Sequence, residues 1–150
     1  PKSERSQRAM DAIQLVGLGG FEGKYPKQLS GGMKMRASLA RTLVLDPSVF
    51  LFDEPFGAVD EITRERLNDE VISLFERQRF AGLFITHSIG EAVFLSTKIV
   101  VMSPRPGRII DVIETKFARD RTLDIRETPA FLEVANRVRN GLREGHSYED

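Results

Sequence analysis

The feature that most constrains this chain is a run of apolar residues that ends in two acids. Residues 49–52 read Val-Phe-Leu-Phe, and Asp53 and Glu54 follow directly. A short continuous apolar run is typical of a strand that is buried on both faces of a parallel sheet. Open parallel sheets bind ligands at the carboxyl ends of their strands. We therefore predict a buried parallel strand with two carboxylates at the end where a ligand would bind.

A second apolar run, over residues 83–86, predicts the neighbouring strand. Between the two runs lies a charged segment, residues 61–79, with apolar residues at helical spacing. The residues expected to face inward on this helix are Leu67, Val71, Leu74 and Phe75. A strand, a helix and a strand in this order form a right-handed parallel crossover. The predicted fold class is therefore α/β.

Further helices and a hairpin are predicted on either side of this crossover. The apolar spacing indicates helices over residues 3–16, from Ser30 to the Asp46-Pro47 pair, over residues 88–96 and from Pro129 onward. Residues 98–102 and 108–113 are predicted strands joined by a Pro- and Gly-containing turn. In the first helix Ser3 is the candidate N-cap and Gly17 the terminator. The last helix carries the apolar residues Phe131, Leu132, Val134, Val138 and Leu142.

Composition excludes several classes of protein. The 22 lysines and arginines balance the 22 aspartates and glutamates, so the chain has no net basic field for a nucleic-acid backbone or an anionic lipid surface. Its apolar segments are shorter than a bilayer span, which argues against a transmembrane helix. The chain has no cysteine, and its two histidines, His87 and His146, are far apart. A disulfide framework is therefore excluded, a zinc centre is not expected, and the composition agrees with a reducing cytoplasm.

Ser30, Gly31 and Gly32 form a candidate anion site at the start of the second predicted helix. The first backbone N–H groups of a helix lack intrahelical acceptors, and the helix dipole is positive there. Glycine also lets a phosphate approach the main chain closely. The simpler alternative is that Ser30 only caps the helix after a flexible loop.

The paired acids Asp53 and Glu54 suit a hydrated magnesium ion and the polarisation of a water molecule. The alternative is that they merely begin a loop. Pro55 and Gly57 then force a sharp turn, which delivers Asp60 to the start of the next helix. Taken alone, Asp60 would be only an N-cap residue.

His87 is the candidate at the end of the second predicted strand. It directly follows residues 83–86, where an imidazole could reach the same phosphate and water as the paired acids. A single histidine is more often structural, and that alternative stays open. His146 lies in a polar tail beside no other motif, so no function is predicted for it.

In order and spacing, these segments resemble the ATPase subunits of ATP-binding cassette (ABC) transporters. Residues 29–33 resemble the signature turn of that family, residues 49–54 its Walker B strand, residues 57–60 its D-loop, and His87 its switch histidine. The sequence around these motifs, at residues 25–28, 53–58, 91–95 and 105–109, is similar to the importer branch for nitrate, sulfonate, taurine and bicarbonate.

This resemblance implies ATP hydrolysis coupled to the uptake of a small anion or an organosulfur or nitrogen-containing solute. It implies that Glu54 is the general base that orients and deprotonates the attacking water, that Asp53 binds Mg²⁺ through water, and that His87 contacts the terminal phosphate. It also implies that Ser30, Gly31 and Gly32 close over an ATP molecule held by a second subunit, and that Asp60 passes between the two subunits.

The partners implied by the resemblance are a second ATPase subunit in a head-to-tail dimer, transmembrane permease subunits and, indirectly, an extracytoplasmic solute-binding protein; no nucleic acid is expected. The implied location is peripheral, on the cytoplasmic face of the cell membrane. The implied fold is a partial P-loop NTPase fold, a parallel sheet with flanking helices plus part of a helical subdomain. Residues 1–45 would form that subdomain with the signature helix, residues 46–114 the core from Walker B to the switch histidine, and residues 115–150 a C-terminal extension.

The chain departs from the family pattern in one major respect. It contains no Gly-x-x-x-x-Gly-Lys-Ser/Thr phosphate loop, so the lysine that neutralises the β- and γ-phosphates and the hydroxyl that binds magnesium are missing. The expectation is therefore the C-terminal part of a cassette, inactive in isolation and with weak ATP affinity or none. Part of its sheet would be uncovered, which predicts marginal stability or aggregation.

Two other functions are weighed against a transport ATPase. The chain could be a non-catalytic interaction piece that packs on a permease or a partner cassette without binding ATP itself. An ABC ATPase of DNA repair or chromosome structure is a remote alternative, because those proteins have long insertions where one short helix and a turn join Ser30 to Asp53 here. The balanced charge also offers no DNA-binding stripe.

Overall fold

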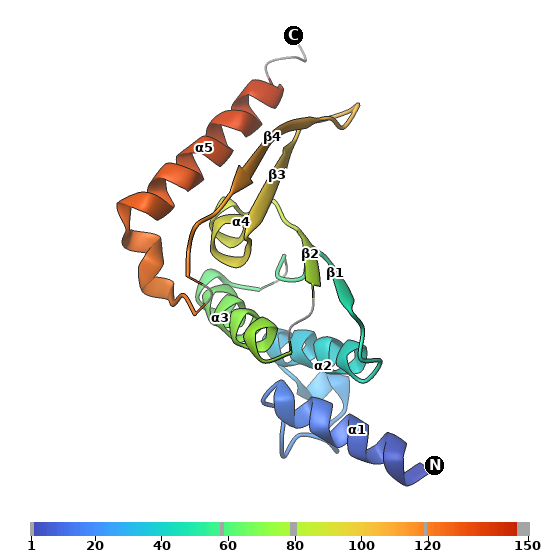
Figure 1. Cartoon of the computed structure of the whole chain (residues 1–150). Coiled ribbons are helices and arrows are strands. Elements are labelled where there is room, and N and C mark those ends of the chain that lie inside the picture. Colours follow the sequence, from blue (N-terminus) through green and yellow to red (C-terminus); the bar gives the residue numbers. More distant parts are fainter. Residues whose placement is uncertain (1, 58, 79–80, 119, 147–150) are drawn as a thin grey trace. The chain divides into compact units, whose positions relative to one another are not determined.

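The computed structural model describes residues 2–57, 59–78, 81–118 and 120–146 (Figure 1). The chain divides into two compact units, Pro1–Ile85 and Thr86–Asp150, and each is described by itself. Among the described helices, none is long and apolar enough to cross a membrane.

The described part of the first unit contains helices and a parallel pair of strands. In chain order the elements are α1 (Lys2–Leu15), η1 (Pro26–Gln28), α2 (Gly31–Leu43), β1 (Val49–Asp53), α3 (Glu61–Gln78) and β2 (Ala81–Ile85). β1 and β2 pair in parallel, with Val49 opposite Ala81 and Asp53 opposite Ile85. This confirms the predicted parallel arrangement of strand, helix and strand. Residue 79, the predicted end of the helix, lies outside the described residues.

Gly17 ends the first helix, as predicted. It has a φ of +66°, and the N–H of Leu18 donates to the carbonyl oxygen of Ile13 at 2.9 Å. A left-handed glycine followed by this hydrogen bond is a common way to satisfy the last carbonyl groups of a helix. The prediction of Ser3 as N-cap is wrong, because helical geometry already begins at Lys2.

One face of the β1–β2 pair packs against α3 through aromatic side chains. The ring centroids of Phe52 and Phe84 are 4.6 Å apart, and Phe75 of α3 lies 6.3 Å from Phe52. Gly82 permits this approach, because a Cβ atom there would lie only 2.4 Å from Cζ of Phe75. The core cluster of the first unit comprises Ala12, Val16, Leu18, Leu39, Ala40, Phe50 and Leu74.

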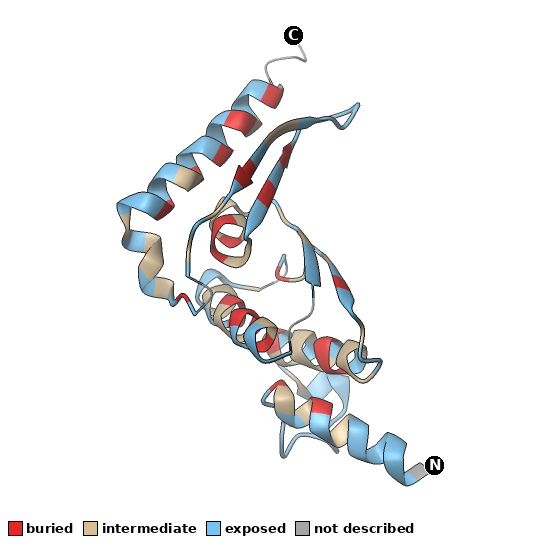
Figure 2. Ribbon diagram, in the orientation of Figure 1, coloured by how far each residue is buried: buried red, intermediate tan, exposed pale blue. Residues whose placement is uncertain are grey.

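The opposite face of the β1–β2 pair is exposed. Leu51 keeps 76% of its accessible surface and its neighbour Leu83 keeps 57%, and the strands are accordingly pale along most of their length in Figure 2. The prediction that β1 is buried on both faces is therefore wrong, since no described element of the first unit covers that face. The expectation of uncovered apolar sheet surface is confirmed.

The described part of the second unit is built around a hairpin. Its elements are α4 (Ile89–Leu95), β3 (Lys98–Met102), β4 (Ile109–Glu114), η2 (Leu123–Glu127) and α5 (Pro129–His146). β3 and β4 are antiparallel, with an irregularity between Val101 and Met102. The predicted hairpin and the helices on either side of it are confirmed.

The last helix, α5, packs against one face of the hairpin. The buried residues at this interface are Ile99, Val101 and Ile113 on the strands and Phe131, Ala135 and Val138 on α5. Gly141 lets the helix approach, because a Cβ atom there would lie 3.3 Å from Cγ1 of Val101. The hydroxyl of Thr128 caps the helix by accepting a hydrogen bond from the N–H of Phe131 at 3.3 Å.

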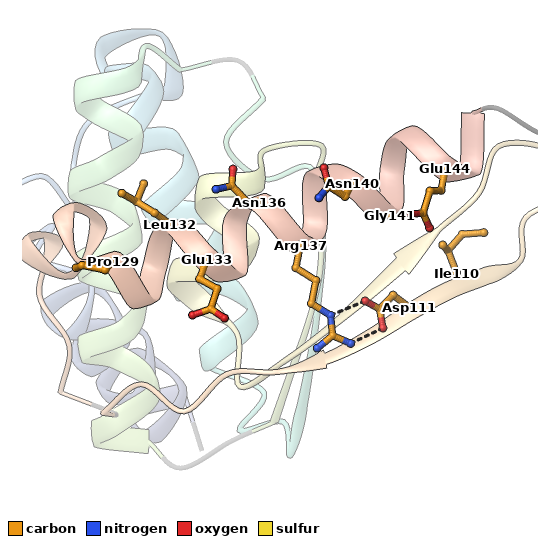
Figure 3. A pocket seen from close by; sticks show the side chains of 10 residues that line it. All are labelled: Ile110, Asp111, Pro129, Leu132, Glu133, Asn136, Arg137, Asn140, Gly141 and Glu144. Carbon is orange, nitrogen blue, oxygen red and sulfur yellow. Dashed lines mark hydrogen bonds and ion pairs between the residues drawn. The ribbon is translucent and has the colours of Figure 1, made fainter.

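A surface groove of about 710 Å³ runs between α5 and β4 (Figure 3). Arg137 of α5 reaches across to β4 and donates two hydrogen bonds to the carboxylate of Asp111, at 2.7 and 2.8 Å. Leu132 lines the same groove and is 52% exposed. Leu132 thus lies on the groove side of α5 rather than among the buried residues of that helix.

Candidate functional site

Ser30 is the N-cap of α2. Its backbone is extended, with φ −65° and ψ 168°, and its hydroxyl accepts a hydrogen bond from the N–H of Met33 at 3.2 Å. Helix geometry leaves the N–H groups of Gly31 and Gly32 without an intrahelical acceptor. Ser30 therefore caps the helix, as the simpler alternative states. The same geometry provides two backbone donors that an anion could use.

The two glycines bring this turn against the start of α3. A Cβ atom on Gly32 would lie 3.3 Å from Cγ2 of Thr63, and one on Gly31 would lie 3.6 Å from Cγ1 of Val59. Gly32 is buried, so a side chain there would displace its neighbours. The structure thus brings the Ser-Gly-Gly turn and the segment before α3 together in the first unit. Ala58, in that segment, lies outside the described residues.

Asp60 holds the first turn of α3. Its carboxylate accepts a hydrogen bond from the N–H of Thr63 at 3.0 Å, and its carbonyl oxygen accepts one from the N–H of Arg64 at 2.9 Å. Hydrogen bonding from the Thr63 side chain, and secondly from its backbone, lowers the pKa of Asp60 below its ordinary value. Asp60 is therefore an N-cap, and its negative charge suits the positive end of the helix.

Glu54 has an unusual backbone at the end of β1. Its N–H donates to the carbonyl oxygen of Ile85 at 2.9 Å, which extends the β1–β2 pairing by one residue. Its φ of +47° is left-handed, which costs a residue other than glycine about 1–2 kcal/mol. The N–H of Gly57 closes the turn on the Glu54 carbonyl oxygen at 3.1 Å. Both Asp53 and Glu54 are exposed, so their carboxylates are accessible to a ligand.

The paired acids fit a magnesium ion better than a metal held by protein alone. Within the described residues there is no group of three or more His, Cys, Asp or Glu side chains that could hold a metal. Mg²⁺ commonly binds through one or two carboxylates, several waters and the phosphates of a substrate. Asp53 and Glu54 are two accessible carboxylates at the end of a parallel strand. They would supply the protein ligands of such a magnesium site.

His87 is the second residue of the second unit, and it is exposed. The residues on either side of it are joined by a hydrogen bond, in which the N–H of Ser88 donates to the hydroxyl of Thr86 at 3.0 Å. Ser88 is also the N-cap of α4, as its hydroxyl accepts from the N–H of Glu91 at 3.3 Å. Because His87 and Glu54 belong to separately described units, their joint role stays a prediction.

Known proteins share the sequence of this region. Residues 2–57 match the ABC transporter family. The taurine import ATP-binding protein TauB of Rhizobium johnstonii is 42% identical over 154 residues, which cover 99% of this chain and 58% of that protein. This chain belongs to the ABC transporter family. The aliphatic sulfonates import ATP-binding protein SsuB of Bacillus cereus is 43% identical over 126 residues, covering 84% of this ABC chain and 49% of that protein. The ABC chain thus spans about half the length of these curated relatives.

Solved structures of ABC proteins have the same fold. A metal-chelate type ABC transporter in an inward-facing conformation superposes with a TM-score of 0.67 and 26% identity, covering 73% of this chain and 44% of that one. The ABC cassette MJ0796, solved as a dimer, gives a TM-score of 0.54 and 33% identity, covering 67% and 43%. The predicted fold class, a partial ABC ATPase fold of the P-loop NTPase type, is confirmed. The division into residues 1–45, 46–114 and 115–150 stays a prediction.

Sequence reasoning missed three residues that support the candidate site. The N–H of Thr63 donates to Asp60, and the hydroxyl of Thr86, the residue directly before His87, donates to Glu91. A signal was present for one of them, because Ser88 and Glu91 have the spacing of a capping box, in which a serine cap is followed by Glu three residues later. The left-handed backbone of Glu54 had no signal, since a residue that precedes proline usually adopts an extended conformation.

Proposed function

We propose that this chain is part of an ATP-binding and ATP-hydrolysing subunit that drives the import of a small anion or an organosulfur or nitrogen-containing solute. The observation that carries the proposal is the pair of accessible carboxylates, Asp53 and Glu54, at the carboxyl end of the parallel strand β1. The strained backbone of Glu54 supports it, because such strain clusters at functional sites. The solute class is supported by the names of the relatives, which specify taurine and aliphatic sulfonates.

In this proposal Glu54 is the general base. Its carboxylate orients a water molecule toward the terminal phosphate of ATP and accepts a proton from it. The water oxygen bonds to the γ-phosphorus as the bond from that phosphorus to the bridging oxygen breaks, and ADP leaves. His87 contacts the terminal phosphate. Asp53 would hold Mg²⁺ through water, and the ion would supply positive charge next to the phosphates when bound.

The Ser30 turn acts on the nucleotide of a second subunit. The N–H groups of Gly31 and Gly32 and the positive end of α2 provide the chemistry that binds phosphate oxygens. Asp60 passes between the two subunits in this proposal, which is supported by its place just beyond Val59, a residue next to this turn. In a head-to-tail dimer each ATP would then be enclosed by both subunits. The dimeric state of the related cassette MJ0796 supports this arrangement.

The remaining partners follow from coupling ATP hydrolysis to import. We propose that the subunit binds transmembrane permease subunits at the cytoplasmic face of the membrane as a peripheral protein. An extracytoplasmic solute-binding protein would take part only indirectly, through the permease. The import functions in the names of the relatives support this assignment.

The proposal is tested by Glu54→Gln in the full-length subunit. We expect turnover of ATP to fall by about 10²–10⁴-fold, the usual contribution of a general base, with ATP binding retained. Glu76→Gln, which changes an exposed glutamate on α3, is the matched control and should leave turnover unchanged. Turnover of the Glu54→Gln variant equal to that of the parent would remove Glu54 from the mechanism.

A second candidate is a non-catalytic interaction piece, and the exposed face of the β1–β2 pair favours it. Leu51 is 76% exposed on a strand of a type that is usually covered on both faces, so this face is suited to packing on another polypeptide. The 150 residues also contain no phosphate-loop lysine. We therefore expect calorimetric titration of the 150-residue chain with MgATP to show weak binding or none. Tight binding would contradict the interaction-piece alternative.

A further inference from the structure

The short loop that carries His87 is closed by a ring of three hydrogen bonds. The N–H of Ser88 donates to the hydroxyl of Thr86 at 3.0 Å, and that hydroxyl donates to Oε2 of Glu91 at 2.6 Å. The ring is completed by the N–H of Glu91, which donates to the hydroxyl of Ser88 at 3.3 Å. His87 is the one residue between Thr86 and Ser88, so both of its peptide neighbours are members of the ring.

Glu91 is the buried member of this ring. Only 4% of its surface is accessible, although glutamate is seldom fully buried unless it is paired or hydrogen-bonded. A carboxylate taken out of water is costly unless donors reach it, and the O–H···O distance of 2.6 Å to Thr86 is in the range of strong, charge-assisted hydrogen bonds. The hydroxyl of Thr86 is therefore a donor that holds the buried carboxylate of Glu91.

The ring is an expanded form of the usual helix capping box. In an ordinary capping box the glutamate at the third helical position accepts directly from the N–H of the cap residue. Here the hydroxyl of Thr86 is inserted between the two, accepting from Ser88 and donating to Glu91. The insertion ties the residue before His87 to the residue after it, which a direct capping box would not do.

The helix α4 is further held by packing within the second unit. Its residues Val93 and Phe94 are fully buried. The guanidinium carbon of Arg126 lies 5.1 Å from the ring centroid of Phe94, and Nη1 of Arg126 lies 3.7 Å from the position that a Cβ atom would occupy on Gly90. The ring around His87 is thus anchored on a helix that cannot easily shift.

We propose that Thr86 and Glu91 are positioning residues for His87. They fix the backbone on both sides of His87, so that its exposed imidazole is presented in one orientation rather than sampling several. This inference rests on the proposed function, in which His87 contacts the terminal phosphate. It adds that the rate of ATP hydrolysis depends on the hydroxyl of Thr86, because this hydroxyl and the buried carboxylate of Glu91 hold His87 in position.

The test compares Thr86→Val with Thr86→Ser in the full-length subunit. Valine keeps the shape of threonine but removes the hydroxyl, whereas serine keeps the hydroxyl. We expect Thr86→Val to lower kcat for ATP by about tenfold to a hundredfold, the size of effect that a small misplacement of a reacting group produces. Its KM for ATP should stay within about twofold, because this residue does not itself bind nucleotide. Thr86→Ser should keep most of the kcat of the parent.

Two further variants separate positioning from a general effect on folding. His87→Ala alone and the double variant Thr86→Val with His87→Ala should have the same kcat, because a residue that acts through His87 adds nothing once the imidazole is gone. Glu91→Gln keeps an acceptor oxygen for Thr86 and should lose less kcat than Glu91→Leu. Helix content by circular dichroism should be unchanged in Thr86→Val.

Each outcome decides between the inference and the function on which it rests. If His87→Ala is impaired and Thr86→Val is not, the positioning role is overturned and the proposed function stands. If the double variant is worse than His87→Ala, Thr86 acts independently of His87 and the positioning role is again overturned. If His87→Ala turns over ATP like the parent, the proposed role of His87 is wrong and the positioning role is overturned with it.

Discussion

The parallel pair β1–β2 and the hairpin β3–β4 each pack one face on helices and expose the other, but the two exposed faces differ. On the hairpin, Val100 and Val112 are opposite each other, and the ion pair between Lys98 and Glu114, at 3.4 Å, lies on the same face. On the parallel pair the exposed face is apolar along the strands, with Leu51 opposite Leu83. Antiparallel sheets commonly present one face to water, whereas parallel sheets are almost always covered on both.

The two regions also differ in how their strands are covered by helices. The hairpin has α5 across its buried face, and Arg137 of α5 fastens the helix to Asp111 of β4. The parallel pair carries the candidate catalytic acids at its carboxyl end, yet one of its faces lacks a covering layer among the described residues. The region with the candidate chemistry is therefore the one with an uncovered apolar face among the described residues.

The largest predicted difference between the two exposed faces is in self-association of the chain. In the 150-residue chain, replacing Leu51 and Leu83 together by serine should lower concentration-dependent association measured by analytical ultracentrifugation. Burial of one leucine is worth about 1.5 kcal/mol or more, so we expect the association constant to fall at least tenfold. The matched control replaces Val100 and Val112 of the hairpin by serine and should change association little. Equal effects of the two double variants would show that the two exposed faces do not differ.

The next prediction compares how closely the two strand pairs pack on their helices, by the change in the free energy of unfolding when a glycine at each interface is replaced by alanine. Gly82→Ala should lower the free energy of unfolding by about 1–3 kcal/mol, the usual cost of overpacking, because the new Cβ atom would lie 2.4 Å from Phe75. Gly141→Ala brings a Cβ atom to 3.3 Å from Val101, and the gain of about 1 kcal/mol in helix propensity offsets this contact. Urea denaturation measures both changes.

Gly23→Ala is the control for this pair, since a Cβ atom there would have no neighbour within 4 Å. It should leave the free energy of unfolding nearly unchanged. A cost for Gly82→Ala no larger than that for Gly23→Ala would show that Phe75 moves aside freely, and that the packed face of the parallel pair is no tighter than that of the hairpin.

The parts of this molecule that sequence reasoning predicted are those with local signals. Ser30 as a cap, Gly17 as a terminator and the hairpin turn each depend on neighbours a few residues away, and all three are confirmed. The exposure of Leu51 had no such signal, because an apolar run in a sequence reads the same whether its second face is covered or not.

The candidate site shows the same limit. The spacing of Ser88 and Glu91 predicts a capped helix, but it could not show that the hydroxyl of Thr86 stands between them. That insertion depends on where a side chain points rather than on residue spacing. The left-handed backbone of Glu54 likewise runs against the local preference of a residue before proline.

The last prediction concerns the ion pair between Arg137 of α5 and Asp111 of β4, and we expect its effect on stability to be small. Hydrogen bonding from Arg137 lowers the pKa of Asp111 below its ordinary value of 3.8. A carboxyl group with a lowered pKa stabilises the folded state fully above the pKa of the unfolded chain, and that stability is lost as pH falls through the lower pKa of the folded state. Asp111→Asn should therefore reduce the stability of the second unit at neutral pH and flatten its decline below about pH 4.

The size of this change should be modest and should shrink with added salt, because the pair lies at the surface, where solvent and ions screen it. Thermal melts of the chain between neutral and acidic pH, at low and high salt, measure it, and Asp120→Asn serves as the control for loss of an exposed aspartate. A pH dependence of Asp111→Asn identical to that of the parent would show that the packing of α5 on the hairpin owes its stability to the buried residues Val101, Ala135 and Val138 rather than to the ion pair. The hairpin would then resemble the parallel pair in depending on apolar packing alone, and the difference between the two regions would lie only in the faces that they leave exposed.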